Sequence, residues 1–234
     1  KYYCMVGVFG SGWPALCPTF SQTHIESGIA GVLNSLTPVF TFVLGVLFFT
    51  MKFEKNKLYG LIVALTGAII LVYFDKAPGG ESNLLYALPL FVATMSYATS
   101  ANLVKRYLQT AHPLTLGAVG FSFIGIPAII YLFTTDFLQH SHDEYFTISL
   151  SSILALSFFG TVIASIGYYT LIQRTDAIFG SLVTYLIPIV AILIGFIDGE
   201  KLFFYHLIGM LFILAGIYII NAKPKVQASE NATK

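Results

Sequence analysis

The sequence predicts an all-α fold, a polytopic bundle of transmembrane helices. Of its 234 residues, 56% are apolar and only 10% are charged, and the mean hydropathy is +0.81. Soluble domains are about half apolar and about a quarter charged, so the composition excludes an ordinary soluble globule. The apolar residues also lie in long uncharged runs, which fit helices of about 20 residues better than the short alternating strands of a membrane barrel.

The runs free of Asp, Glu, Lys and Arg predict eight transmembrane helices. Glycine and proline within these runs are tolerated in membrane helices, and the charged and turn-forming residues between them are typical of loops. In chain order, the predicted helices cover residues 2–20, 28–49, 57–74, 84–103, 114–134, 148–172, 177–197 and 204–221. The tail, residues 222–234, is polar and lacks aromatic residues, so we expect it to be disordered.

The charges between the runs predict the orientation of the chain. If both termini are cytoplasmic, ten of the twelve Lys and Arg residues lie on the cytoplasmic side, and only Lys76 and Lys201 lie outside. Cytoplasmic loops of membrane proteins carry an excess of Lys and Arg. The distribution therefore favours an even number of spans with both termini cytoplasmic. We expect the membrane to be a plasma membrane, such as the bacterial inner membrane.

A weak internal repeat relates the two halves of the chain. With a shift of 150 residues, Phe9-Gly10-Ser11 matches Phe159-Gly160-Thr161, and Leu36-Thr37-Pro38 matches Leu186-Ile187-Pro188. After one inserted residue the shift becomes 149, and at this shift two glycines of the first copy match two glycines of the second. These are Gly60 and Gly67, which match Gly209 and Gly216.

The second copy contains two further helices before the matched ones, so the repeat unit has five helices. Consecutive units with an odd number of helices enter the membrane in opposite senses, which is the inverted repeat of many secondary transporters. The same shift places the first two helices of the first copy before residue 1. We therefore expect eight helices of a ten-helix architecture, with the chain truncated at its N-terminal side.

The repeat segments resemble the fourth helix of each EamA-type repeat in the drug/metabolite transporter superfamily. They read Ser-Gly-Ile-Ala-Gly-Val-Leu-Asn-Ser-Leu-Thr-Pro at 27–38 and Ala-Ile-Phe-Gly-Ser-Leu-Val-Thr-Tyr-Leu-Ile-Pro at 177–188. Gly199-Glu200 with Gly209 and Ala215-Gly216 resembles the pattern that closes such a repeat, whereas the first copy has Phe49-Thr50 at the place of Gly199-Glu200.

The resemblance implies a domain organisation and a function. Residues 1–74 would be the last three helices of the first EamA-type repeat, 84–221 the complete second repeat, and 222–234 a cytoplasmic tail. The expected function is secondary transport of a small neutral or zwitterionic metabolite, such as an amino acid or a related compound, by alternating access. The expected partners are this solute and the lipid bilayer, with a homodimer left open and no nucleic acid, since the net charge is only +1.

Polar residues on one face of an apolar helix predict where the solute binds, because a polar side chain facing lipid is costly. In the seventh helix they recur at helical spacing up to Pro188, and equivalent positions of the second helix are also polar. Close helix packing would explain the same residues. The set also includes tyrosines of the fourth and sixth helices and the single tryptophan. This tryptophan could instead be an interfacial anchor. The predicted binding residues are Asn34, Ser35, Pro38, Tyr97, Tyr168, Ser181, Thr184, Tyr185 and Trp13.

Other classes of site have little support. No Asp, Glu, Lys, Arg or His lies near the middle of a predicted helix, which argues against a proton relay or a charged solute. No cofactor motif occurs, and Cys4 and Cys17 are too far apart along one helix to pair. A membrane enzyme would need the loop with His140 and His142, a weak metal pattern, and a non-transporting scaffold would need a larger exposed surface. We therefore predict no catalytic residue, no metal and no cofactor.

Overall fold

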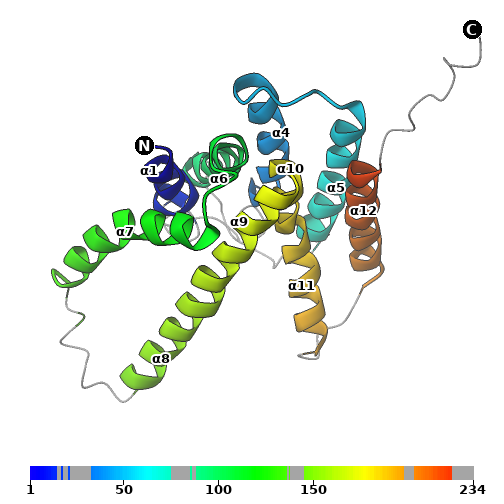
Figure 1. Cartoon of the computed structure of the whole chain (residues 1–234). Coiled ribbons are helices and arrows are strands. Elements are labelled where there is room, and N and C mark those ends of the chain that lie inside the picture. The colour runs from blue at the N-terminus through cyan, green and yellow to red at the C-terminus, as the bar shows by residue number, and fades with distance from the viewer. Residues whose placement is uncertain are drawn as a thin grey trace, which may run out of the picture. The chain divides into compact units, whose positions relative to one another are not determined.

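The computed structural model describes residues 1–14, 17, 21, 33–74, 85, 88–135, 137, 145–197 and 203–222. Nearly all of these residues are helical and no strand occurs among them, which confirms the predicted all-α fold (Figure 1). The chain divides into two compact units. Unit 1 comprises Lys1–Met51 and Ala77–Thr184, and unit 2 comprises Lys52–Lys76 and Tyr185–Lys234.

Unit 1 is built from helices that lie where the apolar runs predict them. They are α1 (Tyr2–Gly7) with the π-helical segment η1 (Val8–Gly12), α4 (Thr37–Phe48), α6 (Leu88–Tyr107), α7 (Pro113–Leu132), α8 (Phe146–Leu156), the π-helical segment η4 (Ser157–Ile163), α9 (Ala164–Arg174) and α10 (Ala177–Ser181). Helix α1 continues into η1 without a break, and α8, η4 and α9 form one uninterrupted rod. Most observed ends lie within a few residues of the predicted ones.

Unit 2 contains α5 (Lys55–Phe74), α12 (Phe204–Asn221) and most of α11 (Val183–Ile197), whose first two residues belong to unit 1. Two predicted helices differ from the prediction. A turn at Leu182 divides the run 177–197 into α10 and α11, and α4 begins only at Thr37, after a turn at Ser35 and Leu36. Hydropathy gives no sign of these turns, because the residues that form them are apolar or uncharged.

The apolar helices suit a lipid environment. Three helical stretches in the described ranges, Pro113–Leu132, Phe146–Arg174 and Phe204–Asn221, are each long and apolar enough to cross a bilayer. Large apolar side chains on them are exposed, among them Tyr131 at 71% and Leu156 at 72%. Such surfaces are unfavourable in water and ordinary against lipid.

Aromatic contacts bring three helix ends together at one end of unit 1. The ring of Tyr2, where α1 begins, stacks on the ring of Tyr107, where α6 ends, with centroids 4.3 Å apart. The ring of Phe49, just after α4, lies 6.4 Å from the same tyrosine. The start of α1 and the ends of α4 and α6 therefore lie side by side.

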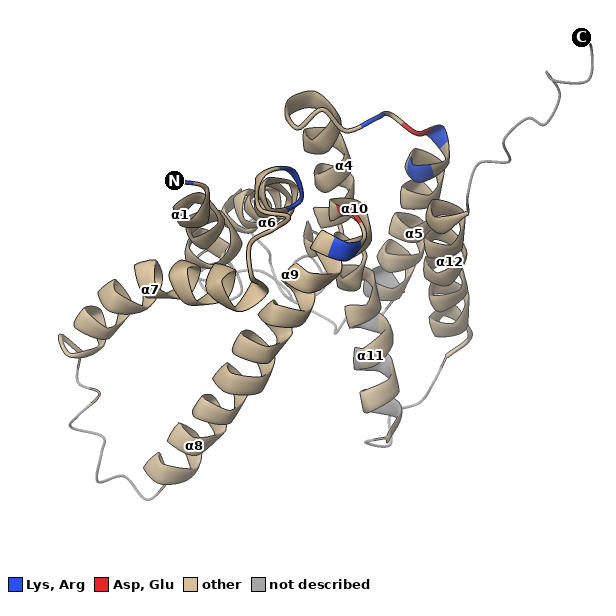
Figure 2. Cartoon of the chain, in the orientation of Figure 1, with Lys and Arg blue, Asp and Glu red and all other residues tan. Residues whose placement is uncertain are grey.

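Hydrogen bonds add the end of α9 to this group. Lys105 Nζ donates to the backbone oxygens of Gln173 and Thr175, and Gln173 Nε2 donates to those of Leu108 and Ala111 at 2.7 Å each. These bonds join the end of α9 to the last turn of α6 and to the segment that follows it. Figure 2 shows basic residues at the ends of α6 and α9.

Within unit 2, α5 and α12 pack in opposite directions through four glycines. A Cβ added at Gly60 would lie 2.7 Å from the backbone oxygen of Gly216, and one at Gly67 would lie 2.6 Å from that of Gly209. The contacts run from the start of α5 to the end of α12, so the helices are antiparallel. In the register of the repeat, Gly60 is equivalent to Gly209 and Gly67 to Gly216. Each contact is therefore the counterpart of the other, as a local twofold axis produces.

Candidate functional site

Five hydroxyl-bearing side chains from three elements of unit 1 form a hydroxyl cluster. Its members are Ser11 of η1, Tyr97 and Ser100 of α6, and Tyr168 and Tyr169 of α9. The rings of the two adjacent tyrosines on α9 lie 5.9 Å apart at the centroids, and Tyr97 lies near both. The side chain of Ser11 lies near the hydroxyl of Tyr169. The predicted pair Tyr97 and Tyr168 is therefore brought together in the fold.

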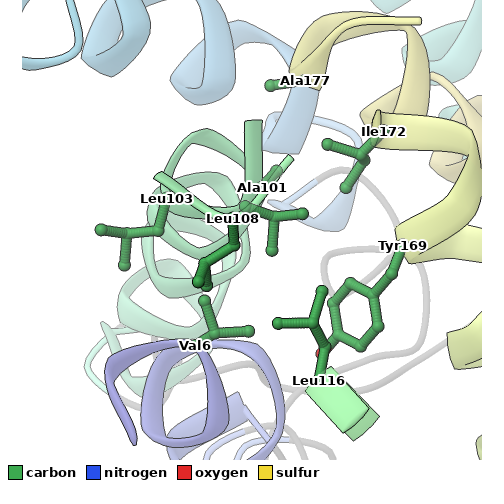
Figure 3. Packing of buried hydrophobic residues seen from close by; sticks show 9 residues of the cluster. Val6, Ala101, Leu103, Leu108, Leu116, Tyr169, Ile172 and Ala177 are labelled. Atoms are coloured by element: carbon green, nitrogen blue, oxygen red, sulfur yellow. The ribbon is translucent and has the colours of Figure 1, made fainter. Parts of the chain in front are cut away.

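The apolar core of unit 1 fixes the position of Tyr169 in this cluster. Its ring is 4% exposed and belongs to a group of buried residues from α1, α6, α7, α9 and α10. Figure 3 shows the ring pointing into the space that Leu116 of α7 and Val6 of α1 also enter. Apolar packing thus places the ring, and its hydroxyl reaches the cluster.

The segment η1 approaches α6 closely at Gly10. A Cβ built on Gly10 would lie 2.5 Å from Ser100 Oγ and 3.4 Å from the hydroxyl oxygen of Tyr169. Any larger residue would therefore displace a member of the hydroxyl cluster. π-Helical segments are rare and often occur at functional sites, and here the segment brings the consecutive residues Gly10 and Ser11 against the same cluster.

The hydroxyl of Ser100 differs from the other serine and threonine hydroxyls on α6. Those of Thr94, Ser96 and Thr99 each donate to a backbone oxygen three or four residues earlier, at 2.7 to 2.8 Å. Ser100 is 2% exposed, and its Oγ has no hydrogen-bond partner. A buried hydroxyl without a partner is unfavourable, so this atom calls for an explanation.

The predicted polar residues at the start of α4 lie on a broken helix. Asn34 precedes the turn and Ser35 lies in it. Pro38 lies in the first helical turn of α4, where its missing N–H leaves no interior hydrogen bond unmade. Pro38 therefore lies at a helix start and not in the interior of a helix. Asn34 is half-buried, and its backbone oxygen accepts from Thr37 Oγ1 at 2.7 Å.

The equivalent residues of the second repeat cross the turn between α10 and α11. The hydroxyls of Ser181 and Thr184 donate to the backbone oxygens of Ile178 and Ser181, at 2.7 and 2.9 Å. Tyr185, in unit 2, is fully buried and its hydroxyl has no hydrogen-bond partner. Pro188 falls inside α11.

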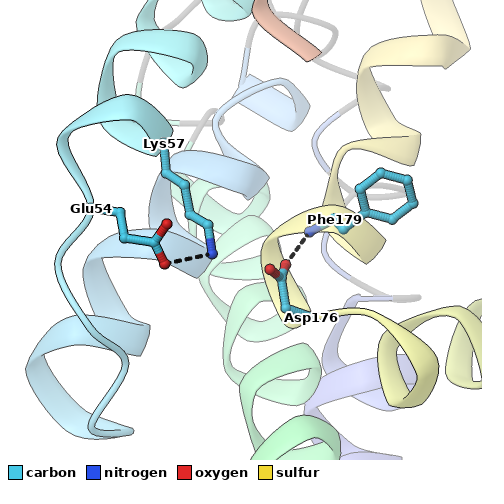
Figure 4. A network of polar contacts seen from close by, with 4 residues as sticks. All are labelled: Glu54, Lys57, Asp176 and Phe179. Atoms are coloured by element: carbon cyan, nitrogen blue, oxygen red, sulfur yellow. Dashed lines mark hydrogen bonds and ion pairs between the residues drawn. The ribbon is translucent and has the colours of Figure 1, made fainter. Parts of the chain in front are cut away.

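The N-terminus of α10 has a side-chain cap. Asp176 Oδ1 accepts from the backbone N–H of Phe179 at 2.7 Å (Figure 4). An aspartate in this position accepts from a backbone N–H that the helix leaves unpaired. Its negative charge also interacts favourably with the positive end of the helix dipole. In unit 2, the Glu54 carboxylate pairs with Lys57 Nζ at 3.1 Å across the first turn of α5. Both acids are therefore at helix starts and outside the hydroxyl cluster.

Sequence reasoning selected some residues of the site and missed others. Tyr169, Ser100 and Ser11 join the cluster although they were not among the predicted binding residues. The match of Phe9-Gly10-Ser11 with Phe159-Gly160-Thr161 was a signal for Ser11, and the spacing of Ser100 from Tyr97 was a weaker signal for Ser100. Trp13 lies just beyond η1 and remains 50% exposed.

Some sequence-based interpretations lie outside the described residues. They concern the loop of His140 and His142, Glu200 and the tail after residue 222. In the part of the chain that the structure describes, no group of His, Cys, Asp or Glu has the arrangement of a metal site.

Comparisons with known proteins identify the family. An uncharacterized transporter of Archaeoglobus fulgidus is 26% identical over 219 residues, which cover 93% of this chain and 76% of that protein. A probable amino-acid metabolite efflux pump of Salmonella typhimurium is 25% identical over 204 residues, 83% of this chain and 67% of that protein. A solved crystal structure, at 14% identity, shares the fold with a TM-score of 0.72 over 94% of this chain and 74% of its own.

The family model assigns nearly the whole chain. It describes EamA-like transporters and matches residues 1–73 and 84–222. Several of the relatives that resemble this chain are named as transporters, and the long apolar helices agree with that description. The chain is therefore an integral membrane protein and not an enzyme, and it belongs to the EamA-like transporter family.

Proposed function

We propose that this protein moves a small neutral or zwitterionic metabolite, such as an amino acid or a related compound, across a plasma membrane by alternating access. The observation that carries the proposal is the hydroxyl cluster of unit 1, which unites tyrosine and serine hydroxyls from three helical elements and, among the residues that the structure describes, includes no acid or base. In a bilayer these groups are costly to bury unless they serve packing, a hydrogen-bond network or a ligand.

The chemistry of the cluster favours a solute without net charge. Hydroxyl groups can both donate and accept, so they can hold an amide, a hydroxyl or a carboxylate oxygen. A solute with net charge would need a charge of opposite sign to offset its loss of hydration, and the cluster has none. The ammonium group of a zwitterion could lie against the faces of Tyr97 and Tyr168. The name of the Salmonella relative, a probable amino-acid metabolite efflux pump, agrees with this class.

The antiparallel α5 and α12 support alternating access. They occupy equivalent positions in the two repeats and pack against each other in opposite directions in unit 2. Inverted repeats of this kind allow one half of a transporter to rock against the other around a site near the midplane. The basic helix ends of unit 1 then lie on the cytoplasmic side, which agrees with cytoplasmic termini and with the inner membrane of a bacterium.

The proposed binding residues are those predicted from the sequence, together with the rest of the hydroxyl cluster. Tyr97 and Tyr168 lie in that cluster. Tyr185 contributes a buried hydroxyl without a partner in unit 2. The residues on the equivalent stripes of the two repeats are Asn34, Ser35, Pro38, Ser181 and Thr184, and Trp13 lies beyond η1.

Solute-dependent thermal stabilisation tests the proposed function. The purified chain is heated with each neutral L-amino acid in turn and, for comparison, with glutamate and lysine. A ligand that binds only the folded state raises the melting temperature. We expect a rise with at least one neutral amino acid, uptake of that compound into liposomes, and loss of both in Tyr97→Phe/Tyr168→Phe. Stabilisation by glutamate or lysine alone would contradict the proposed solute class, and a double variant that still binds would remove these tyrosines from the site.

A further inference from the structure

We propose that Ser100, together with Tyr169, forms a hydrogen-bonding subsite for an oxygen acceptor of the transported metabolite, and that η1 covers this subsite and must move to open it. The inference rests on the proposed function, since it names a contact that the solute would make. It assigns a binding role to Ser100 and a gating role to the π-helical segment at Gly10.

The first argument is the unused hydroxyl of Ser100. The three other serine and threonine side chains on α6 use a backbone oxygen of their own helix. The same kind of bond is open to a serine in any helix, yet Ser100 Oγ points instead at η1 and makes no hydrogen bond. Because the oxygen is buried, only a group that enters the site could accept a hydrogen bond from this hydroxyl.

The second argument is the place of Tyr169. Both its hydroxyl oxygen and Ser100 Oγ lie close to the position that a Cβ of Gly10 would occupy, at 3.4 and 2.5 Å. An acceptor that replaced Gly10 at this point would be within reach of both hydroxyls. The absence of a side chain at residue 10 therefore lets the backbone close over two groups that suit a solute oxygen.

The third argument concerns η1 as a cover. The last residue of α1, Gly7, packs closely against α7, because a Cβ at Gly7 would lie 2.7 Å from Gly120 Cα. Beyond that contact, the chain changes to π-helical geometry at Val8. Ser100 is 2% exposed, so a solute can reach it only if the part of the helix that starts at Val8 moves away from α6.

The equivalent segment of the second repeat shows that the π-helical geometry has a local origin. The matching residues Phe159-Gly160-Thr161 lie in η4, which is also π-helical. Residues of η4 are exposed, whereas η1 packs against α6 and α7. Since the same motif takes the same form with and without tight packing, the contact with Ser100 does not create it.

Cysteine labelling tests the opening of η1. In a background with Cys4→Ala and Cys17→Ala, Ser100→Cys is treated in membrane vesicles with a water-soluble methanethiosulfonate reagent. Ala98→Cys is the matched control, because Ala98 is also buried on α6 but two residues away, on another face. Gln109→Cys, in the exposed turn after α6, shows that the reagent is active. We expect Ser100→Cys to react at least tenfold faster than Ala98→Cys. Equal rates at the two positions would overturn the proposal.

A second pair of variants tests the hydrogen bond. Ser100→Ala removes the unused hydroxyl, and Ser96→Ala removes one that already bonds to Val92. We expect Ser100→Ala to keep or raise the melting temperature without solute and to lose stabilisation by the neutral amino acid that binds the wild type. Ser96→Ala should keep that stabilisation. If Ser100→Ala binds like the wild type, the subsite is refuted. If the wild type binds no neutral amino acid, the proposed function fails, and the labelling alone decides whether η1 uncovers Ser100.

Discussion

Two close helix contacts, one in each unit, use glycine in different ways. In unit 2, α5 and α12 meet backbone to backbone, with Gly60 and Gly67 against carbonyl groups of the facing helix. In unit 1, Gly10 of η1 meets the hydroxyl of Ser100, the end of a short side chain. The first contact includes backbone atoms that cannot rotate away, whereas the nearest atom in the second is a hydroxyl that can rotate. The difference indicates a fixed contact in unit 2 and an adjustable one in unit 1.

The largest effect is expected for Gly67→Ala. The new Cβ would lie 2.6 Å from the backbone oxygen of Gly209 and 2.8 Å from the backbone nitrogen of Ile213. Since backbone cannot rotate away, the helices must separate, and overpacking of this kind costs about 1–3 kcal/mol. Thermal unfolding in detergent should show a clear fall in melting temperature.

The control for this variant is Gly167→Ala in α9, where no atom lies within 4 Å of the added Cβ. Alanine favours a helix over glycine by about 1 kcal/mol, so Gly167→Ala should be neutral or stabilising. A Gly67→Ala protein as stable as its control would show that α5 and α12 do not meet through their backbones.

Gly10→Ala should separate stability from function. The new Cβ meets the Ser100 hydroxyl, which can rotate, so we expect a stability loss near the lower limit for overpacking, about 1 kcal/mol. Binding of the neutral amino acid should fall much more strongly, because the displaced groups belong to the hydroxyl cluster. Adding Ser100→Ala should restore the melting temperature and leave binding impaired. If the double variant were no more stable than Gly10→Ala, the contact with Ser100 would not be the source of the strain.

A smaller effect is expected where a side chain joins two helices of unit 1. Asn102 of α6 is 2% exposed, and its Nδ2 donates to the backbone oxygen of Thr41 of α4 at 2.9 Å. Hydrogen bonds between membrane helices contribute about 0.6 kcal/mol on average, so Asn102→Leu should lower stability slightly. Thr99→Val, which removes a bond within α6, should change it less. If Asn102→Leu lowered the melting temperature as much as Gly67→Ala, the contact between α5 and α12 in unit 2 would not be the more rigid one.

Hydropathy predicted the helices because lipid selects long apolar runs, and α12 ends at the predicted residues. It did not predict the turns at Ser35 and Leu182, since a turn among apolar or uncharged residues changes neither hydropathy nor charge. The repeat register paired Gly60 with Gly209, but the contact of Gly60 with Gly216 follows only from the antiparallel packing of the two helices.

The site shows the same limit. Tyr97 and Tyr168 were predicted as large polar side chains in apolar helices, and the fold brings them together. Which of the two adjacent tyrosines on α9 enters the core depends on the rotation of that helix, and Tyr169 is the more buried. The approach of Ser11 depends on the π-helical geometry of η1, for which spacing in the sequence offers no rule.

Two-sided access to one site is the central claim, and cysteine substitution at Asn34 or Thr184 tests it most directly. These residues lie at the repeated stripe of polar positions, one in each copy. In a background without other cysteines, a membrane-impermeant thiol reagent is added either to right-side-out or to inverted vesicles. Alternating access predicts that each cysteine reacts in both preparations and that a bound neutral amino acid slows both reactions. Reaction from neither side would contradict the account.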